Sequence, residues 1–169
     1  KTNKNLKRVV TCTTRDAREG EVDGVDYYFL DKLEFLERLE SGKFLEHAVV
    51  YGKYYGTLKS SVYDSFTAGQ DVLIVNDVQG ALVLQAMARA DVKLEGALKT
   101  VFMILNDLDA LRARILSRGA EGEGAIEDRL SIAEAEMAQA AAFDYVVESR
   151  TRDEDFERAR EIYLKHAGI

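Results

Sequence analysis

The residues of this chain that can do chemistry are arginines, tyrosines and carboxylates placed just after predicted strands. Thr13-Thr14-Arg15, followed by Arg18, comes directly after an apolar run centred on Val9 and Val10. Open α/β proteins bind ligands at the carboxyl ends of their strands, and an arginine fork matches two phosphate oxygens at once. We therefore interpret the two arginines as candidate phosphate ligands, with an exposed, solvated loop as the alternative.

A second group of polar residues lies in a segment rich in glycine and tyrosine. Tyr27 follows an Asp-Gly turn signal, and the adjacent Tyr54 and Tyr55 lie between glycines. Adjacent tyrosines in such a flexible segment make a poor core, because their hydroxyl groups need partners, and their phenols can donate to a phosphate. Glu46 precedes the tyrosine pair and is either part of a site or a surface charge, the usual fate of a glutamate.

Two further candidate groups occur in the second half of the chain. Asp77 ends a buried strand, where its carboxylate either faces a ligand crevice or caps the following helix. Arg114 and Arg118 are four residues apart and share one side of a helix, and Arg129 follows beyond a glycine-rich stretch. Three arginines around flexible glycines describe either a basic helix surface or a lid over transferring phosphates.

The elements that must position these residues alternate between strands and helices. We expect strands over 6–13, 27–30, 72–75, 101–105 and 145–147. We expect helices from 31 (with a capping box between Asp31 and Glu34) to 42, and over 58–68, 81–90, 108–117, 125–142 and 153–166. This alternation predicts an α/β fold with a largely parallel sheet, in which 72–75 is buried on both faces. The region 20–57 is predicted to be an insertion with its own small sheet.

Composition excludes several other classes of protein. The 169 residues suit one domain, and a net charge of −7 argues against nonspecific nucleic-acid binding. No apolar run approaches the roughly 18 residues that a membrane span needs, and no signal peptide is recognised, so we expect no membrane partner. Cys12 is the only cysteine, so no internal disulfide forms, in keeping with a reducing cytoplasm.

Taken in order, these motifs resemble those of the guanylate kinase family from about Leu6 to the last helix. The matching motifs are Thr-Thr-Arg-x-x-Arg-x-Gly-Glu-x-x-Gly-x-Asp-Tyr, Phe-Leu-Glu, Tyr-Tyr-Gly-Thr, Asp-x-Gln-Gly and Arg-x-x-x-Arg-Gly with Arg-Leu eleven residues later. The resemblance implies a P-loop-kinase-like parallel sheet flanked by helices, with a small mixed-sheet GMP-binding insertion and a helical lid. It also implies phosphorylation of GMP to GDP by ATP, with Mg²⁺ accompanying ATP.

The resemblance also assigns roles to individual residues. By position, the implied ligands of the GMP phosphate are Arg15, Arg18, Tyr27 and Tyr55. The implied guanine readers are Glu46 and Thr57, with Asp77 and Thr11 beside them. The implied catalytic arginines are Arg114, Arg118 and Arg129, and no protein metal ligand is expected. We expect a single domain over 1–169, with its core in 1–19 and 58–169, the insertion in 20–57 and the lid in 114–130.

Three departures from the family pattern bear on activity. The sequence contains no Gly-x-x-x-x-Gly-Lys-Ser/Thr loop, Val75 stands where the family has an aspartate, and Ser149 or a neighbour replaces an asparagine near the ATP base. Without the strand that carries this loop, a parallel sheet has two unpaired edges, so we expect further residues upstream of Lys1. The alternatives are a catalytically inactive guanylate-kinase-like module that binds phosphorylated partners and a different nucleotide kinase of the same fold. Glu46 and the tyrosine pair argue against the latter.

Overall fold

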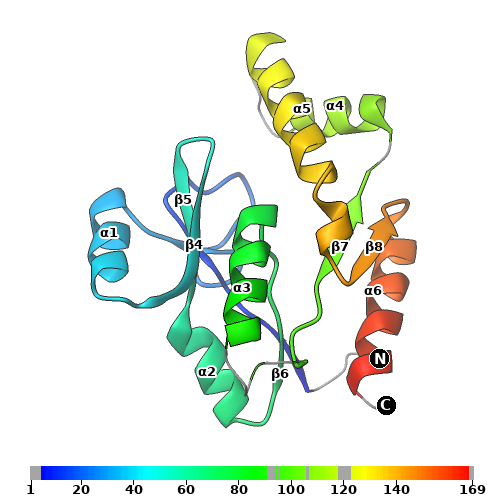
Figure 1. The fold of residues 1–169 in the computed structure, drawn as a ribbon. Coiled ribbons are helices and arrows are strands. Elements are labelled where there is room, and N and C mark those ends of the chain that lie inside the picture. Colours follow the sequence, from blue (N-terminus) through cyan, green and yellow to red (C-terminus); the bar gives the residue numbers. More distant parts are fainter. Residues whose placement is uncertain (1–4, 91–93, 95, 106, 118–122, 168–169) are drawn as a thin grey trace. The chain divides into compact units, whose positions relative to one another are not determined.

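The chain forms two compact units, Lys1–Asp91 and Val92–Ile169. The computed structural model describes residues 5–90, 94, 96–105, 107–117 and 123–167, and its elements are labelled in Figure 1. Each unit contains parallel strands and helices, which confirms the α/β class.

The first unit contains a mixed four-stranded sheet in the order β3-β2-β5-β4. Its strands are β2 (Cys12–Thr13), β3 (Tyr28–Phe29), β4 (Phe44–Val50) and β5 (Lys53–Leu58). β4 and β5 form an antiparallel hairpin, and its turn uses left-handed backbone at Tyr51 (φ 49°) and Gly52 (φ 72°). A mixed sheet is what the sequence predicts for this region, although the sheet also recruits β2 from before the expected insertion.

A second, two-stranded sheet pairs β1 (Leu6–Arg8) with β6 (Asp71–Leu73) in parallel. The single strand predicted over 6–13 is therefore wrong: the chain leaves β1 after Val9, whose N–H still donates to the Leu73 carbonyl, and joins the other sheet at β2. The prediction that 72–75 is buried on both faces is also wrong, since Leu73 is 46% and Val75 62% exposed. Within the described residues β6 has β1 as its paired neighbour and lies at a sheet edge.

Three helices complete the first unit: α1 (Lys32–Glu40), α2 (Lys59–Thr67) and α3 (Val78–Ala90). Asp31 caps α1, with its Oδ1 accepting from the Glu34 N–H at 2.8 Å. The predicted capping box is only half formed, because the Glu34 carboxylate pairs with Arg38 at 2.6 Å instead of returning to the cap. Gly42 ends the α1 segment as predicted, with φ +63° and its N–H donating to the Leu39 carbonyl.

The core of the first unit gathers around Phe35, which is fully buried and stacks on Phe44 with ring centroids 4.3 Å apart. Cys12 belongs to the same cluster, and burial raises the pKa of its thiol to about 11. The buried face of α1 is therefore centred on Phe35, whereas Leu33 is 69% exposed. In α2, Val62 and Ser65 are buried, whereas Phe66 is exposed.

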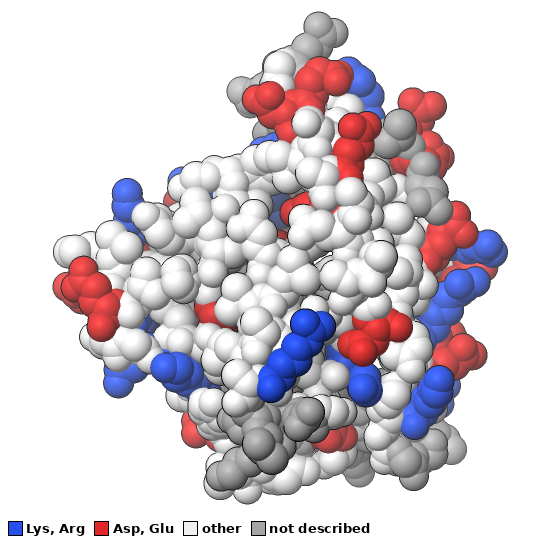
Figure 2. Space-filling model, in the orientation of Figure 1, with Lys and Arg blue, Asp and Glu red and all other residues white. Residues whose placement is uncertain are grey.

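The second unit pairs β7 (Val101–Ile104) in parallel with β8 (Tyr145–Glu148). Its helices are α4 (Leu108–Ser117), α5 (Glu123–Met137) and α6 (Arg152–Ala167). The helix predicted over 125–142 ends at Met137, and a short 3₁₀ turn, η1 (Ala140–Ala142), follows. Ile115 of α4 packs with Ile126 of α5. Along α6, side chains of both charge signs are interspersed, as Figure 2 shows at the right-hand edge.

We predict that Phe35→Ala lowers the free energy of unfolding by about 3–5 kcal/mol, because it opens a cavity in a closed aromatic cluster. Chemical denaturation followed by circular dichroism measures this loss. Leu33→Ala, on the same helix but exposed, is the matched control and changes stability by at most about 0.5 kcal/mol. Equal losses for the two variants would show that the core of this unit lies elsewhere.

Candidate active site

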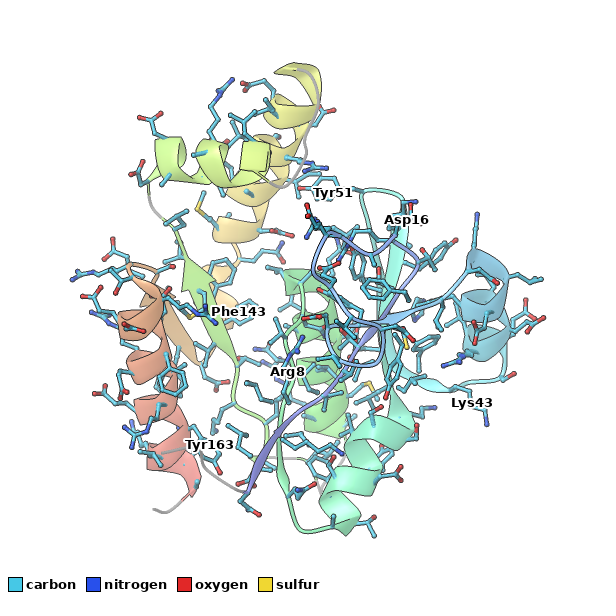
Figure 3. The ribbon with its side chains drawn as sticks, turned by 180° about the vertical axis from the view of Figure 1, so that it is seen from behind. Arg8, Asp16, Lys43, Tyr51, Phe143 and Tyr163 are labelled. Atoms are coloured by element: carbon cyan, nitrogen blue, oxygen red, sulfur yellow. The ribbon has the colours of Figure 1, made fainter. Side chains whose placement is uncertain are left out.

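The loop after β2 is held firmly at its base. The fully buried Thr13 accepts a hydrogen bond at Oγ1 from the Arg15 N–H at 3.2 Å. Thr14 is tied to β5 in both directions: its N–H donates to the Tyr54 carbonyl, and its Oγ1 accepts from the Tyr54 N–H. The sheet therefore fixes the backbone from which Arg15 projects. Figure 3 labels Asp16 in this loop and Tyr51 in the β4–β5 turn at the same end of the unit.

Arg15 is held by a two-pronged ion pair with Glu21. Its two terminal nitrogens donate to the two carboxylate oxygens at 2.9 Å each, and one of them also donates to the Asp16 carbonyl at 2.6 Å. The guanidinium lies over the Tyr27 ring at 5.4 Å. Hydrogen bonding to Glu21 raises the pKa of Arg15, although burial opposes it, and a hydrogen bond with Tyr55 adds to the increase.

Glu21 joins both candidate phosphate-binding arginines. Besides the pair with Arg15, its Oε2 accepts a hydrogen bond from the backbone N–H of Arg18 at 2.7 Å. The hydrogen bonds from Arg15 lower the pKa of Glu21, so its carboxylate stays charged. The Arg18 side chain itself is exposed. The sequence motif contains Glu21 but assigns it no role, and its spacing of three and six residues from the arginines is the only local signal for one.

Tyr27 and Tyr55 complete what we call the arginine cluster, together with Arg15, Arg18 and Glu21. The two tyrosine rings meet edge to face with centroids 6.2 Å apart. β5 places Tyr55 directly opposite Thr13 of β2. The four residues predicted to hold a phosphate therefore lie in one region. They bring two arginine guanidinium groups and two tyrosine hydroxyl groups to it.

Glu46 and Thr57 form a second, buried group. They face each other in the β4–β5 register, and the Thr57 hydroxyl donates to Glu46 Oε1 at 2.5 Å. Glu46 is 3% exposed and Thr57 is fully buried, so this glutamate is not the surface charge that its residue type alone would suggest. Thr11 is also buried, and its carbonyl accepts from the Tyr28 N–H, which fixes β3.

Asp77 and Gly80 bring the start of α3 against this group. Asp77 Oδ1 accepts from the Gly80 N–H at 2.8 Å, so this residue caps α3 in the structure. A Cβ atom at Gly80 would lie 2.7 Å from Glu46 Oε2 and 2.7 Å from Asn76 Nδ2. Gly80 thus allows a helix backbone to approach a buried carboxylate. We call Glu46, Thr57, Asn76 and Gly80 the carboxylate cluster.

In the second unit the structure describes only part of the predicted lid. Arg129 lies on α5 and is half-buried. Arg114 belongs to α4, but its side chain lies outside the described residues, as does the whole of Arg118. Arg112, which the sequence motifs do not include, pairs with Glu127 across α4 and α5 at 3.0 Å. Ser149 donates to Asp155 Oδ2 at 2.6 Å near the start of α6.

The described residues offer neither a preformed metal site nor a membrane span. No group of three or more His, Cys, Asp and Glu side chains in that part of the chain is placed to hold a metal ion. None of the helices built from described residues combines the length and apolar character that crossing a bilayer requires.

Comparisons with known proteins point to one family. The family model described as guanylate kinase matches residues 1–166. The guanylate kinase of Clostridioides difficile (strain 630) is 40% identical over 147 residues, which are 87% of this chain and 68% of that protein. That of Symbiobacterium thermophilum is 42% identical over 138 residues, which are 82% of this chain and 62% of that protein. The chain therefore spans about two thirds of these relatives.

A solved structure agrees with the sequence comparisons. The crystal structure of guanylate kinase from Anaplasma phagocytophilum superimposes with a TM-score of 0.79 at 32% sequence identity. The match covers 95% of this chain and 76% of that one. The shared fold therefore extends over nearly all of this chain.

We predict that Glu21→Gln destabilises the chain by about 1–2 kcal/mol at pH 7, between the values for exposed and buried charged pairs. The folded-state pKa of Glu21 is lowered, so its contribution is present above the ordinary glutamate pKa of about 4.3 and is lost as the pH falls through the folded value. Thermal melts from pH 7 to pH 3 should therefore show the two proteins converging in acid.

The matched control for this experiment is Glu34→Gln. Glu34 also pairs with an arginine, but that pair is more exposed, with side-chain exposures of 34% for Arg38 and 44% for Glu34. Glu34→Gln should therefore lower the free energy of unfolding by at most about 0.5 kcal/mol. A difference between wild type and Glu21→Gln that stays constant down to pH 3 would contradict the assigned ion pair.

Proposed function

Because this chain belongs to the guanylate kinase family, we propose that it binds GMP and takes part in transferring the γ-phosphoryl group of ATP to it. The observation that carries this proposal is the buried Glu46 carboxylate held by Thr57. The matched relatives are guanylate kinases, which favours an enzyme over the binding-module alternative.

The carboxylate cluster supplies what a guanine base needs. Guanine presents two donors, N1–H and the 2-amino group, and an ionised carboxylate is an acceptor with two oxygens. Adenine presents an acceptor at N1 and lacks the 2-amino group, so it would leave the buried Glu46 partly unpaired. Leaving a buried polar group unpaired costs about 1–3 kcal/mol, more for a charge, and this penalty selects guanine.

The arginine cluster supplies what the GMP phosphate needs. Arg15, Tyr27 and Tyr55 offer donors that converge on one region, and the exposed Arg18 adds a second positive charge. Tyr55 and Thr57 are two residues apart on β5, so they share a face and lie about 7 Å apart along the strand. A nucleotide that places its base at Glu46 can therefore place its phosphate at the arginine cluster, with the ribose between them.

In the proposed reaction a phosphate oxygen of GMP attacks the γ-phosphorus of ATP. A bond forms between that oxygen and phosphorus as the bond from phosphorus to the oxygen bridging to the β-phosphate breaks, which yields GDP and ADP. Mg²⁺ enters with ATP as the substrate MgATP. Arg114, Arg118 and Arg129 are proposed to neutralise charge on the transferring group, and Asp77 and Thr11 to border the guanine site.

Two narrower expectations stay predictions, because they rest on the sequence alone. One is the single domain, with its core in 1–19 and 58–169, its insertion in 20–57 and its lid in 114–130. The other is the cytoplasmic location.

We predict that the chain binds GMP and prefers it strongly to AMP, CMP and UMP. Glu46→Gln should weaken GMP binding roughly 10–100-fold, because one acceptor oxygen becomes an NH₂ donor that faces guanine donors. Isothermal titration calorimetry with each nucleotide measures both effects. His47→Gln is the control, since His47 is exposed on the opposite side of β4. Equal affinity for AMP and GMP would remove the basis of the proposal.

We predict that Arg129→Ala lowers kcat far more than it raises the KM for GMP when the complete gene product is assayed for GDP formation. The reason is that a contact made mainly in the transition state raises kcat and contributes little to the binding of GMP in the ground state. A loss of about 3–4 kcal/mol of transition-state stabilisation is expected for one such donor, and lysine should restore little of it. Arg112→Ala, which removes the pair with Glu127, is the control. A near-normal kcat for Arg129→Ala would make this arginine part of a solvated helix face.

A further inference from the structure

Asn76 carries an unsatisfied donor in the carboxylate cluster. Its Nδ2 is shielded from solvent and has no hydrogen-bond partner, and no other buried side-chain nitrogen or oxygen of the described residues shares this condition. Nδ2 and Glu46 Oε2 each lie 2.7 Å from the same point, the position of a Cβ at Gly80. The amide donor and the carboxylate oxygen therefore both lie beside one glycine, where α3 packs on β4 (Figure 1).

An unpaired buried N–H is costly, and such groups in native proteins call for an explanation. Glu46 Oε2 is an acceptor that lies beside the same glycine. We therefore consider this carboxylate oxygen as the partner of the amide.

The lone pairs of Glu46 show what the amide can do. An ionised carboxylate offers about four acceptor positions, two on each oxygen. Thr57 occupies one position on Oε1. A purine with donors at N1 and the 2-amino group takes one position on each oxygen. One position on Oε2 then remains free to accept from Asn76.

We propose that Asn76 is a positioning residue for Glu46: its amide nitrogen donates to Oε2 when the carboxylate meets the base, while Thr57 holds Oε1. This inference rests on the proposed function. Hydrogen bonds from Thr57 to Oε1 and from Asn76 to Oε2 then fix the orientation of the carboxylate, so that its edge faces the base. Each oxygen then keeps an acceptor position for one of the two guanine donors.

Calorimetric titration of GMP into three proteins tests the inference. Asn76→Leu, which removes the donor at similar size, should weaken GMP binding about tenfold. Asn76→Asp keeps the shape but replaces the donor by a second carboxylate, so it should weaken GMP binding at least as much. If Asn76 matters only for its shape, Asn76→Asp should bind GMP nearly as well as the wild type, and Asn76→Leu should bind it more weakly. That result would overturn the proposal.

Two further measurements separate positioning from a general structural role. In the Glu46→Gln background, Asn76→Leu should have no further effect on GMP binding, because its action passes through Glu46. Binding of ribose 5-phosphate, which lacks the base, should be unchanged by Asn76→Leu, and the unfolding midpoint without ligand should not fall. A tenfold loss that persists in the Glu46→Gln background, or that appears equally with ribose 5-phosphate, would contradict the proposal.

The outcomes also separate this inference from the function on which it rests. If the wild-type protein does not prefer GMP over AMP, the proposed function and the role of Asn76 are both overturned, because Glu46 then does not recognise guanine. Wild-type protein that prefers GMP, together with an Asn76→Leu variant of the same affinity, overturns the role of Asn76 alone.

Discussion

The burial of one carboxylate is the most demanding constraint in the first unit. Removing an ionised group from water costs several kcal/mol unless hydrogen bonds replace the lost solvent. Glu46 is 3% exposed, and the β4–β5 register sets Thr57 opposite it to supply one such bond. Gly80 lets α3 approach the other oxygen, where any side chain would collide with it. The register of the hairpin and the start of α3 therefore both depend on this group.

The same hairpin links the site to the hydrophobic core, because side chains alternate along β5. Tyr55 and Thr57 lie on the face that carries the site, while Gly56 between them leaves room for the core: a Cβ there would lie 2.8 Å from the Phe44 ring. A shift of register by one residue would exchange the two faces. The packing of Phe44 against Phe35 therefore helps to fix the register that places Tyr55 and Thr57 on the face of the site.

Local signals in the sequence predicted those features that local interactions decide. Asp31 and Gly42 mark the ends of the α1 segment because caps form between residues close in sequence. Burial and strand pairing depend on distant partners, so the exposure of Leu73 and Val75 and the break after Val9 were not foreseen. The site divides in the same way. Residue type and order made Arg15, Glu46 and Thr57 candidates, whereas the contacts of Glu21 and the unpaired amide of Asn76 are seen only when the loop and the start of α3 are placed in space.

Charge balance explains how an acidic chain can bind a phosphate. The charge of Arg15 is already compensated by Glu21, so this pair adds little net potential but holds a donor fork in a fixed direction. The attraction for a dianion therefore falls on Arg18, whose backbone the same carboxylate holds while its side chain stays exposed. Solvent and salt weaken an exposed charge, whereas a buried carboxylate acts with little screening. In the proposed function the two ends of the site consequently have different tasks: the phosphate end would attract the ligand, and the end at Glu46 would select the base.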